Sequence, residues 1–169
     1  MLAHLNPRGH DHLMCNLYNV TTSQEAMRRL FRVGRDLFGN LEPSLDVYPD
    51  RPAPVIRVAE DGERELVPLT WGMPSPPFVT KGRPDTGVTN IRNTSSPHWR
   101  RWLDPSSRCI VPWTTFCEWE DTKPKKTKRW FAINEERPLA VFTGIWTEWN
   151  GARGSMKNPR RARISCSAS

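Results

Sequence analysis

Proline and glycine divide this chain into short segments. Its 169 residues include 16 Pro and 10 Gly, and Val, Ile, Phe and eight Trp recur in short runs between them. Proline interrupts helices, whereas β-branched and aromatic residues are typical of strands. A chain of this length can bury one hydrophobic core without disulfide bonds. The sequence therefore predicts a single α+β domain rich in strands rather than a helix bundle.

The positive charge of the chain is concentrated near its C-terminal end. The formal net charge is +7, but residues 151–169 contain five Lys or Arg and no acid. The residues before them hold 20 Lys and Arg against 18 Asp and Glu, a net charge of +2. Basic proteins often bind nucleic acid. Here most of the excess lies in one segment, so the charge is weak support for such a partner.

The cysteines and the N-terminal segment indicate a reducing compartment. The four cysteines lack both Cys-x-x-Cys spacing and the density of a secreted disulfide scaffold. The first 13 residues lack the apolar core of a signal peptide, and no apolar stretch approaches the length of a membrane span. We therefore expect a cytoplasmic protein.

Residues 1–14 are interpreted as a leader or removable propeptide. His4, His10 and His12 lie near Cys15 in the sequence, but the segment offers no scaffold that would fix four metal ligands. We therefore expect neither a metal nor another cofactor.

One amphipathic helix is predicted after this segment. Thr22-x-x-Glu25 fits a capping box, and a row of arginines lies opposite an apolar face. That face is predicted to contain Met27, Leu30, Phe31 and Leu37.

Two β-prone runs, at 55–58 and 66–69, flank Asp61-Gly62 and predict a hairpin. Residues 73–87 contain four Pro and two Gly, which predicts an irregular loop suited to lining a cleft.

Further strands are predicted in the second half of the chain, at 109–111, 116–119, 130–133 and 139–143. The lysine-rich segment 123–129 is interpreted as a solvated hairpin loop, with contact to nucleic acid as the alternative. Residues 159–169 show neither alternation nor a helical period and are predicted to be a disordered basic tail.

Cys15 directly follows Met14, so removal of an initiator methionine or of the leader would expose it as the N-terminal residue. Such a cysteine carries a thiol and a free α-amine on adjacent carbons. The amine, with a reference pKa of about 8, attacks an aldehyde to form a Schiff base, and the thiolate then closes a thiazolidine ring. The alternative is an ordinary buried cysteine in the core.

Three clusters hold the other candidate residues. Asn90 and Arg92 lie two positions apart, hence on one side of an extended segment. Glu118 lies between large apolar residues, which would raise its pKa towards the working pH of an acid/base. Trp71 ends a predicted strand. Structural roles stay open for each: Asn90 in a turn, Glu118 facing solvent, and Trp71 and Trp119 in the core.

Several short motifs follow one another in order along the chain. They are Met14-Cys-Asn-Leu-Tyr18, Val47-Tyr-Pro49, Pro52-Ala-Pro-Val-Ile56, Trp71-Gly72, Asn90-x-Arg92, Arg108-Cys-Ile-Val-Pro112, Phe116-x-Glu118-Trp119 and Thr143-Gly-Ile-Trp146. Together they resemble the SOS response-associated peptidase family, from Met14 to about Asn158. The specificity of the resemblance lies in the joint order and spacing of the motifs.

This resemblance implies a curved, mostly antiparallel, barrel-like sheet with a few peripheral helices. It also implies a protein that binds single-stranded DNA and forms a thiazolidine crosslink with the ring-opened sugar of an abasic site. Cys15 would be the crosslinking residue, freed by autoproteolysis or an aminopeptidase. Asn90 would orient the sugar or the amine, Glu118 would transfer protons and Arg92 would bind a phosphate. The cleft would be shaped by Pro49, Trp71 and Trp119, which would stack or wedge against bases.

The family domain is assigned to residues 15–158 and is expected to act as a monomer, nucleoid-associated when bound to DNA. The family also has a C-terminal histidine in a His-x-x-Met-Pro-like segment, to which no histidine here corresponds; His98 lies too early in the order. We therefore expect a C-terminally incomplete domain with slowed proton transfer. One alternative is a non-catalytic single-stranded DNA-binding remnant of the fold. Another is a cysteine hydrolase acting on peptides with His98.

Overall fold

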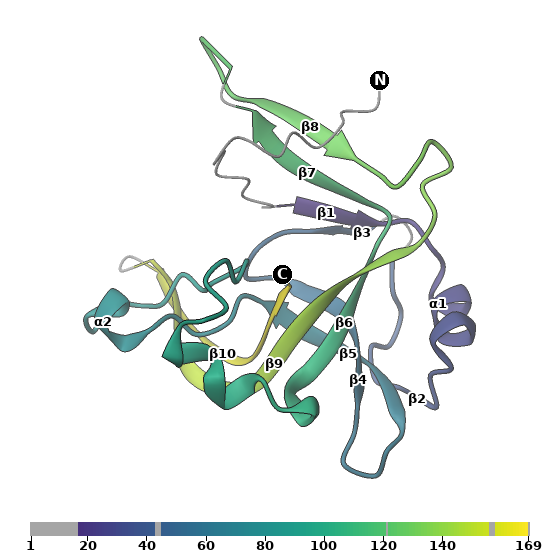
Figure 1. Cartoon of the computed structure of the whole chain (residues 1–169), viewed down its shortest axis with the longest axis horizontal. Helices are drawn as coiled ribbons and strands as arrows, with labels where there is room; N and C mark the ends of the chain where they lie inside the picture. The colour runs from purple at the N-terminus through teal and green to yellow at the C-terminus, as the bar shows by residue number, and fades with distance from the viewer. Residues whose placement is uncertain (1–16, 43–44, 121, 156–157, 169) are drawn as a thin grey trace.

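The computed structural model describes residues 17–42, 45–120, 122–155 and 158–168, with side chains up to Gly154. Figure 1 shows a molecule built mainly of strands. The strands are β1 (Leu17–Val20), β2 (Arg35–Asp36), β3 (Leu45–Val47), β4 (Pro52–Val58), β5 (Arg64–Trp71), β6 (Arg108–Trp113), β7 (Thr115–Glu120), β8 (Thr127–Phe131), β9 (Ala140–Ser155) and β10 (Asn158–Ala168). The helices are α1 (Gln24–Phe31) and α2 (Pro77–Thr80), with the 3-10 segments η1 (Pro97–Trp102) and η2 (Pro105–Ser107).

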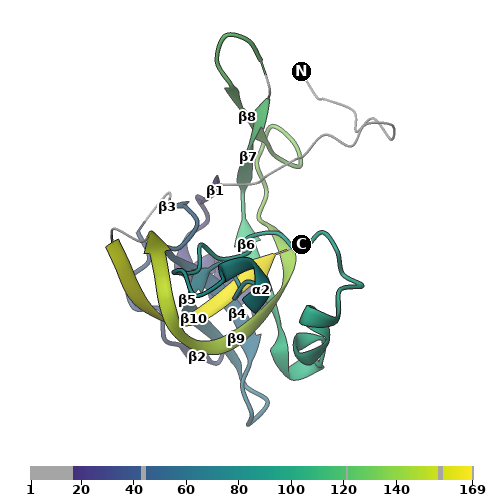
Figure 2. The ribbon, with the colours of Figure 1, turned by 90° about the vertical axis from the view of Figure 1, so that its left-hand side faces the viewer.

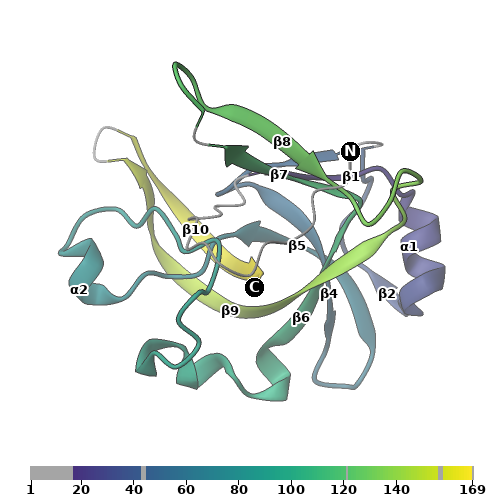
Figure 3. The same cartoon turned by 45° about the horizontal axis from the view of Figure 1, so that its top comes forward.

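The strands form two sheets. One has the order β3-β1-β7-β8, and the other has the order β10-β9-β6-β4-β5-β2. All pairings are antiparallel except β2 with β5 and the two-residue contact of β10 with β5. The sheets are curved but not closed into a barrel, and Figure 3 shows the sweep of the long strand β9. The prediction of a strand-rich α+β fold with a curved, mostly antiparallel sheet is thus confirmed.

The main core lies where the two sheets face each other. Its buried apolar side chains come from β1, β3, α1, β4, β5 and β6 and include Tyr18, Val20, Val55, Leu69 and Val111. These strands present apolar residues at alternate positions or in continuous runs, as expected for strands that pack on one or both faces. Because β1 and β5 both contribute, the core joins the two sheets.

Helix α1 is shorter than predicted and has a different cap. The Ser23 hydroxyl, rather than Thr22, accepts from the N–H of Ala26 at 3.2 Å, and the helix ends at Arg32 in the left-handed region with φ of 51°. Met27 is fully buried, whereas Leu30 is 61% exposed, so the predicted apolar face is only partly correct.

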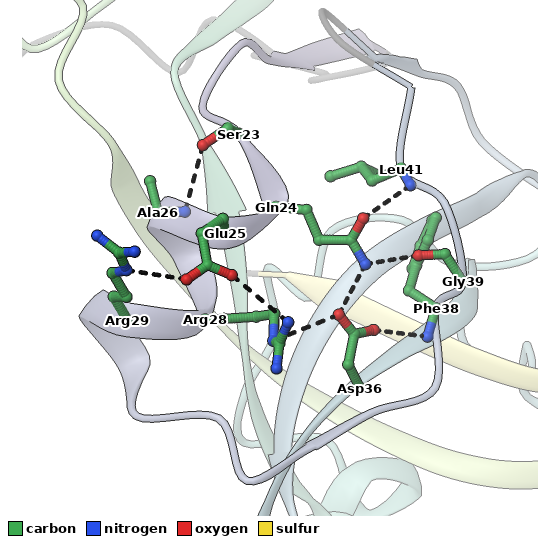
Figure 4. A network of polar contacts seen from close by, with 10 residues as sticks. All are labelled: Ser23, Gln24, Glu25, Ala26, Arg28, Arg29, Asp36, Phe38, Gly39 and Leu41. Atoms are coloured by element: carbon green, nitrogen blue, oxygen red, sulfur yellow. Dashed lines mark hydrogen bonds and ion pairs between the residues drawn. The ribbon is translucent and has the colours of Figure 1, made fainter.

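Gln24 attaches α1 to the segment that follows β2. Its side-chain amide donates to Asp36 and to the carbonyl of Gly39, and its amide oxygen accepts from Leu41 (Figure 4). The helix is therefore held by polar contacts as well as by Met27.

Two predicted hairpins are present. β4 and β5 pair in register around Val55 and Val67, and Gly62 in the turn has φ of 85°. β7 and β8 form the second hairpin, which projects away from the six-stranded sheet (Figures 1 and 2). No helix among the described residues is long and apolar enough to cross a membrane.

The prediction of a disordered tail at 159–169 is wrong as far as Ala168. Residues 158–168 form β10, which pairs with β9 from Asn158 opposite Ser155 to Ala168 opposite Gly144, with a register shift between Ala162 and Ile164. The ladder is made by backbone groups, so it does not require the side-chain alternation that the sequence lacks.

Candidate functional site

The turn after β3 places Pro49 beside the end of β5. The N–H of Arg51 donates to the carbonyl of Tyr48 at 3.2 Å, and Asp50 has φ of 61°, as the third residue of a type II turn requires. The N–H of Asp50 donates to the carbonyl of Trp71 at 2.9 Å, and the N–H of Trp71 donates to the carbonyl of Arg51 at 3.0 Å. The Pro49 turn and Trp71 therefore form one hydrogen-bonded unit.

Trp71 lies in the core. It is 5% exposed, its ring meets that of Tyr18 edge-on with centroids 5.1 Å apart, and its indole N–H donates to the carbonyl of Thr89 at 3.2 Å. The structural alternative left open for Trp71 therefore fits its position. An indole buried to this extent supports the wall of a site and does not present its face to a base.

The hydrogen bond to Thr89 brings Asn90 close to Trp71. Residues 72–90 leave β5 and are closed by two bonds between Met73 and Val88, of 2.9 and 2.8 Å. Asn90 follows this pair, is half-buried, and has its side-chain nitrogen 3.4 Å from the hydroxyl of Thr89. The Pro49 turn, Trp71 and Asn90 thus lie in one neighbourhood, as the resemblance implies.

A buried charged pair lies behind the 72–90 loop. Asp85 is 4% exposed and Arg153 is 1% exposed, with a carboxylate oxygen and a guanidinium nitrogen 3.9 Å apart. The carboxylate of Asp85 also accepts from the N–H and hydroxyl of Ser75 and from the N–H of Gly87. Arg153 donates to the carbonyl of Gly72. The buried carboxylate of Asp85 and the buried guanidinium of Arg153 therefore hold the loop in place.

Burial and mutual attraction shift the pKa values of both Asp85 and Arg153. Burial alone would raise the pKa of Asp85, but hydrogen bonds from Ser75 and Gly87, together with Arg153, hold it below its ordinary value. Burial lowers the pKa of Arg153, while Asp85 and Asp50 act in the opposite direction. The lowered pKa keeps the carboxyl group of Asp85 ionised around neutral pH, and an arginine side chain keeps its charge in proteins.

Arg153 requires glycine on the loop beside it. Gly87 has φ of 80°, and a Cβ atom built there would overlap Nη1 of Arg153. Gly72 has φ of 131°, and its Cβ would lie 3.5 Å from the α-carbon of Gly87. The two glycine backbones thus pass close to each other and to the guanidinium.

Glu118 and Trp119 point to opposite faces of the β7–β8 hairpin. Glu118 is 8% exposed and shares a face with Phe116, which pairs with Tyr18 on β1. Trp119 is 43% exposed on the other face. The solvent-facing alternative for Glu118 and the core alternative for Trp119 are therefore both wrong. Glu118 lies on the face of the four-stranded sheet that carries Tyr18, the contact of Trp71.

Of the remaining predicted residues, the structure describes Arg92 but not Cys15 or the leader. Arg92 is exposed, two residues beyond Asn90. Cys15, the predicted leader at 1–14 and the three leader histidines lie outside the described residues. Among the described residues, no group of three or more His, Cys, Asp or Glu side chains is placed to hold a metal ion.

His98 is engaged elsewhere. Its Nε2 lies 2.9 Å from the carbonyl oxygen of Pro74, and its ring packs edge-on against Trp99 and Trp102. This environment does not favour the peptide hydrolase that would use His98 as its base.

Sequence reasoning missed Asp85, Arg153 and Tyr18. In the sequence, Arg153 belongs to the basic C-terminal residues, but Trp149 and Gly151 precede it, and the guanidinium lies 4.8 Å from the centre of the Trp149 ring. That aromatic and glycine context is the signal that Arg153 belongs to the folded body. Asp85 between Pro84 and Gly87 gave no signal distinct from a turn residue.

A family comparison fits this geometry. A model of the SOS response associated peptidase (SRAP) family matches residues 14–167. The chain belongs to the SRAP family. The match covers the predicted site motifs, and it continues through most of β10, beyond the residue 158 at which the predicted domain ends.

Several curated proteins are similar to this SRAP chain. Abasic site processing protein YoqW of Bacillus subtilis is 28% identical over 148 residues, covering 84% of this chain and 64% of that protein. Abasic site processing proteins YobE and YoaM of the same organism are 28% and 30% identical, over 85% and 69% of this chain and 66% and 51% of their own lengths. The chain thus spans less than two thirds of the length of these relatives.

Solved structures show the same fold. A protein from Bordetella bronchiseptica aligns over 90% of this chain and 70% of its own, with 20% identity and a TM-score of 0.58. A phage-related protein from that organism aligns over 90% and 68%, with 18% identity and the same TM-score. At these identities the likeness concerns the fold.

Proposed function

We propose that this chain binds single-stranded DNA and captures abasic sites covalently through Cys15. The similar proteins named for abasic site processing support this assignment. The observation that carries it is the position of β1. Leu17, two residues after Cys15, lies opposite Cys117, the neighbour of the buried Glu118. The strand that follows Cys15 in sequence therefore begins beside the only carboxylate predicted to transfer protons.

Covalent geometry limits how far Cys15 can be from that carboxylate. Two residues of extended chain span at most about 7 Å, and paired strands lie about 4.8 Å apart. Together these two lengths limit the distance between the α-carbons of Cys15 and Cys117 to about 12 Å. Trp71 and Tyr18 close the neighbouring part of the same face.

The reaction is a condensation that needs no oxidant or cofactor. The α-amine of Cys15 attacks C1′ of the ring-opened sugar, the carbinolamine loses its hydroxyl as water, and the resulting imine carbon is attacked by the thiolate. The proton that leaves the thiol ends on the ring nitrogen, so one aldehyde and one aminothiol give one thiazolidine and one water. Glu118 would protonate the departing hydroxyl, and Asn90 would orient the sugar or the amine.

The remaining predicted residues would position the strand. Arg92, exposed beyond Asn90, would bind a phosphate, and the Pro49 turn with Trp71 behind it would form a wall of the cleft. Exposure of the amine requires hydrolysis of the Met14–Cys15 bond, by the chain itself or by an aminopeptidase. We place the activity in the cytoplasm, on the nucleoid, where a reducing medium keeps the thiol free, and in a monomer.

The test is a crosslinking assay with single-stranded DNA that carries one abasic site. Intact-mass measurement first shows which fraction of the protein begins at Cys15. We expect a stable adduct in proportion to that fraction and none with Cys15→Ala unless borohydride is added, because alanine keeps the amine but cannot close the ring. Cys109→Ala is the matched control, since Cys109 is a buried cysteine of β6 that the proposed chemistry does not use.

Two results would reject the proposal. One is protein that begins at Cys15 but yields no adduct. The other is an adduct without borohydride that is equally stable in Cys15→Ala. Salt-sensitive binding that ignores both the lesion and Cys15 would instead support the non-catalytic binding module.

A further inference from the structure

The outward face of the β7–β8 hairpin carries aromatic and cationic side chains together. In the register of the hairpin, Cys117 pairs with Trp130 and Trp119 pairs with Lys128. Paired residues, and residues two apart, share a face of a strand pair. Trp119, Lys128 and Trp130 therefore lie on one side, with Trp119 43% and Trp130 48% exposed. The ammonium of Lys128 lies 5.3 Å from the centre of the Trp119 ring.

The carboxylates of these strands lie on the opposite side. Glu118 and Glu120 alternate with Trp119, and Glu120 accepts from Arg129 at 2.5 Å on that other face. On the face that carries Trp119 and Trp130, the two strands also carry Lys128 and the buried Thr115 and Cys117, and none of these residues is an acid. The outward face thus combines flat apolar rings with positive charge.

The hairpin tip extends this charge away from the body of the molecule. Lys123, Lys125 and Lys126 lie in the connection between β7 and β8 and are exposed. Figures 1 and 2 show that the hairpin stands clear of the six-stranded sheet. Trp130 itself lines a hollow of about 620 Å³, together with Asp46, Glu135 and Arg137. The lysines of this face lie on the tip side of Trp130, at Lys128 and in the connection between β7 and β8.

We propose that Lys128, Trp130 and the tip lysines extend the contact surface for single-stranded DNA from Trp119, whose base stacking the family resemblance already implies, along this face of the hairpin to its tip. It rests on the proposed function for the identity of the nucleic acid. Bases of any sequence stack on exposed aromatic rings, and lysines bind the backbone phosphates between them. Trp119 and Trp130 are diagonal neighbours, whose backbones are about 7 to 8 Å apart.

The test is the affinity of the full chain for an undamaged single strand of about 30 nucleotides, measured by fluorescence anisotropy over a range of salt concentrations. We expect Trp130→Ala to weaken binding about tenfold, the loss typical of one stacked base. Lys128→Ala should lower the slope of log K against log salt by about 0.7. Trp130→Phe, which keeps a ring, should recover most of the affinity. Leu30→Ala and Arg29→Ala on the exposed side of α1 are matched controls, expected to bind like the wild type.

Several outcomes would overturn this inference. Affinities of Trp130→Ala and Lys128→Ala within twofold of the wild type, with an unchanged salt slope, would do so. Equal losses for duplex DNA and for heparin would show a general polyanion site without base stacking. Crosslinking to an abasic oligonucleotide is read separately, so failure of the hairpin surface remains distinguishable from failure of the Cys15 chemistry.

Discussion

The 72–90 loop and the β7–β8 hairpin differ in what holds them in place. The loop has little regular structure, yet its centre is tied to the buried Asp85 and Arg153. The hairpin has a regular ladder of five residue pairs, yet most of its β8 side chains are exposed. Regular hydrogen bonding alone therefore does not mark the well-anchored part of this molecule. Buried charge fixes the loop that carries Asn90, whereas the hairpin surface remains available for a ligand.

Removing one partner of the buried pair is expected to have the largest effect. In Asp85→Ala the guanidinium of Arg153 stays buried without its carboxylate, which typically costs about 3 to 5 kcal/mol. Chemical denaturation would show this as a lower free energy of unfolding. Asp61→Ala is the control, because Asp61 pairs with the partly exposed Arg35 and should have little effect. A loss for Asp85→Ala as small as that of the control would mean that the pair does not anchor the loop.

The close approach of Gly87 to Arg153 gives a second, smaller test of the loop. Gly87→Ala combines an unfavourable positive φ with overlap of the guanidinium, and we expect a loss of about 3 kcal/mol. Gly82 has almost the same φ, 79°, with no atom within 4 Å of its Cβ position. Gly82→Ala should therefore cost only about 1 kcal/mol. Equal losses in unfolding experiments would show that backbone conformation, and not Arg153, decides the requirement for glycine.

The sequence predicted the hairpins and the strand-rich fold better than it predicted these anchors. The β4–β5 and β7–β8 hairpins follow from local runs of β-prone residues around turns, and such signals are visible in a single segment. The Asp85–Arg153 pair joins residues 68 positions apart, and neither position is distinctive by itself. Strand β10 was not predicted for a related reason. It is stabilised by pairing with β9, and its own sequence shows no alternation of apolar and polar residues.

In the candidate site, too, local motifs predicted some features, whereas others depend on contacts between distant residues. Motif order predicted that the Pro49 turn, Trp71 and Asn90 belong together, and hydrogen bonds join them through Trp71 and Thr89. Glu118 and Trp119 are adjacent in the sequence, but side chains alternate along β7, so the two point to opposite faces of the sheet. Burial of Trp71 depends on packing against Tyr18, a contact that spans 53 positions and carries no local signal.

The anchored loop also predicts a dependence of stability on pH. The pKa of Asp85 is lowered in the folded state, so its ionised form stabilises the fold above its unfolded pKa of about 4. This contribution is lost as the pH falls through the folded pKa. Stability measured from pH 6 downwards should therefore fall more steeply for the wild type than for Asp85→Asn, which cannot titrate there. Parallel curves would contradict the assignment of the lowered pKa to Asp85.

The smallest effect is expected on the hairpin. Glu120 and Arg129 form an ion pair with side chains 41% and 57% exposed. Exposed pairs contribute about 0.5 kcal/mol or less, because water screens the charges and the side chains lose freedom. A double-mutant cycle with Glu120→Ala and Arg129→Ala should therefore give a coupling near this value, falling further in high salt. A coupling as large as the loss in Asp85→Ala would remove the contrast between the two regions, because the hairpin would then be held by charge as firmly as the loop.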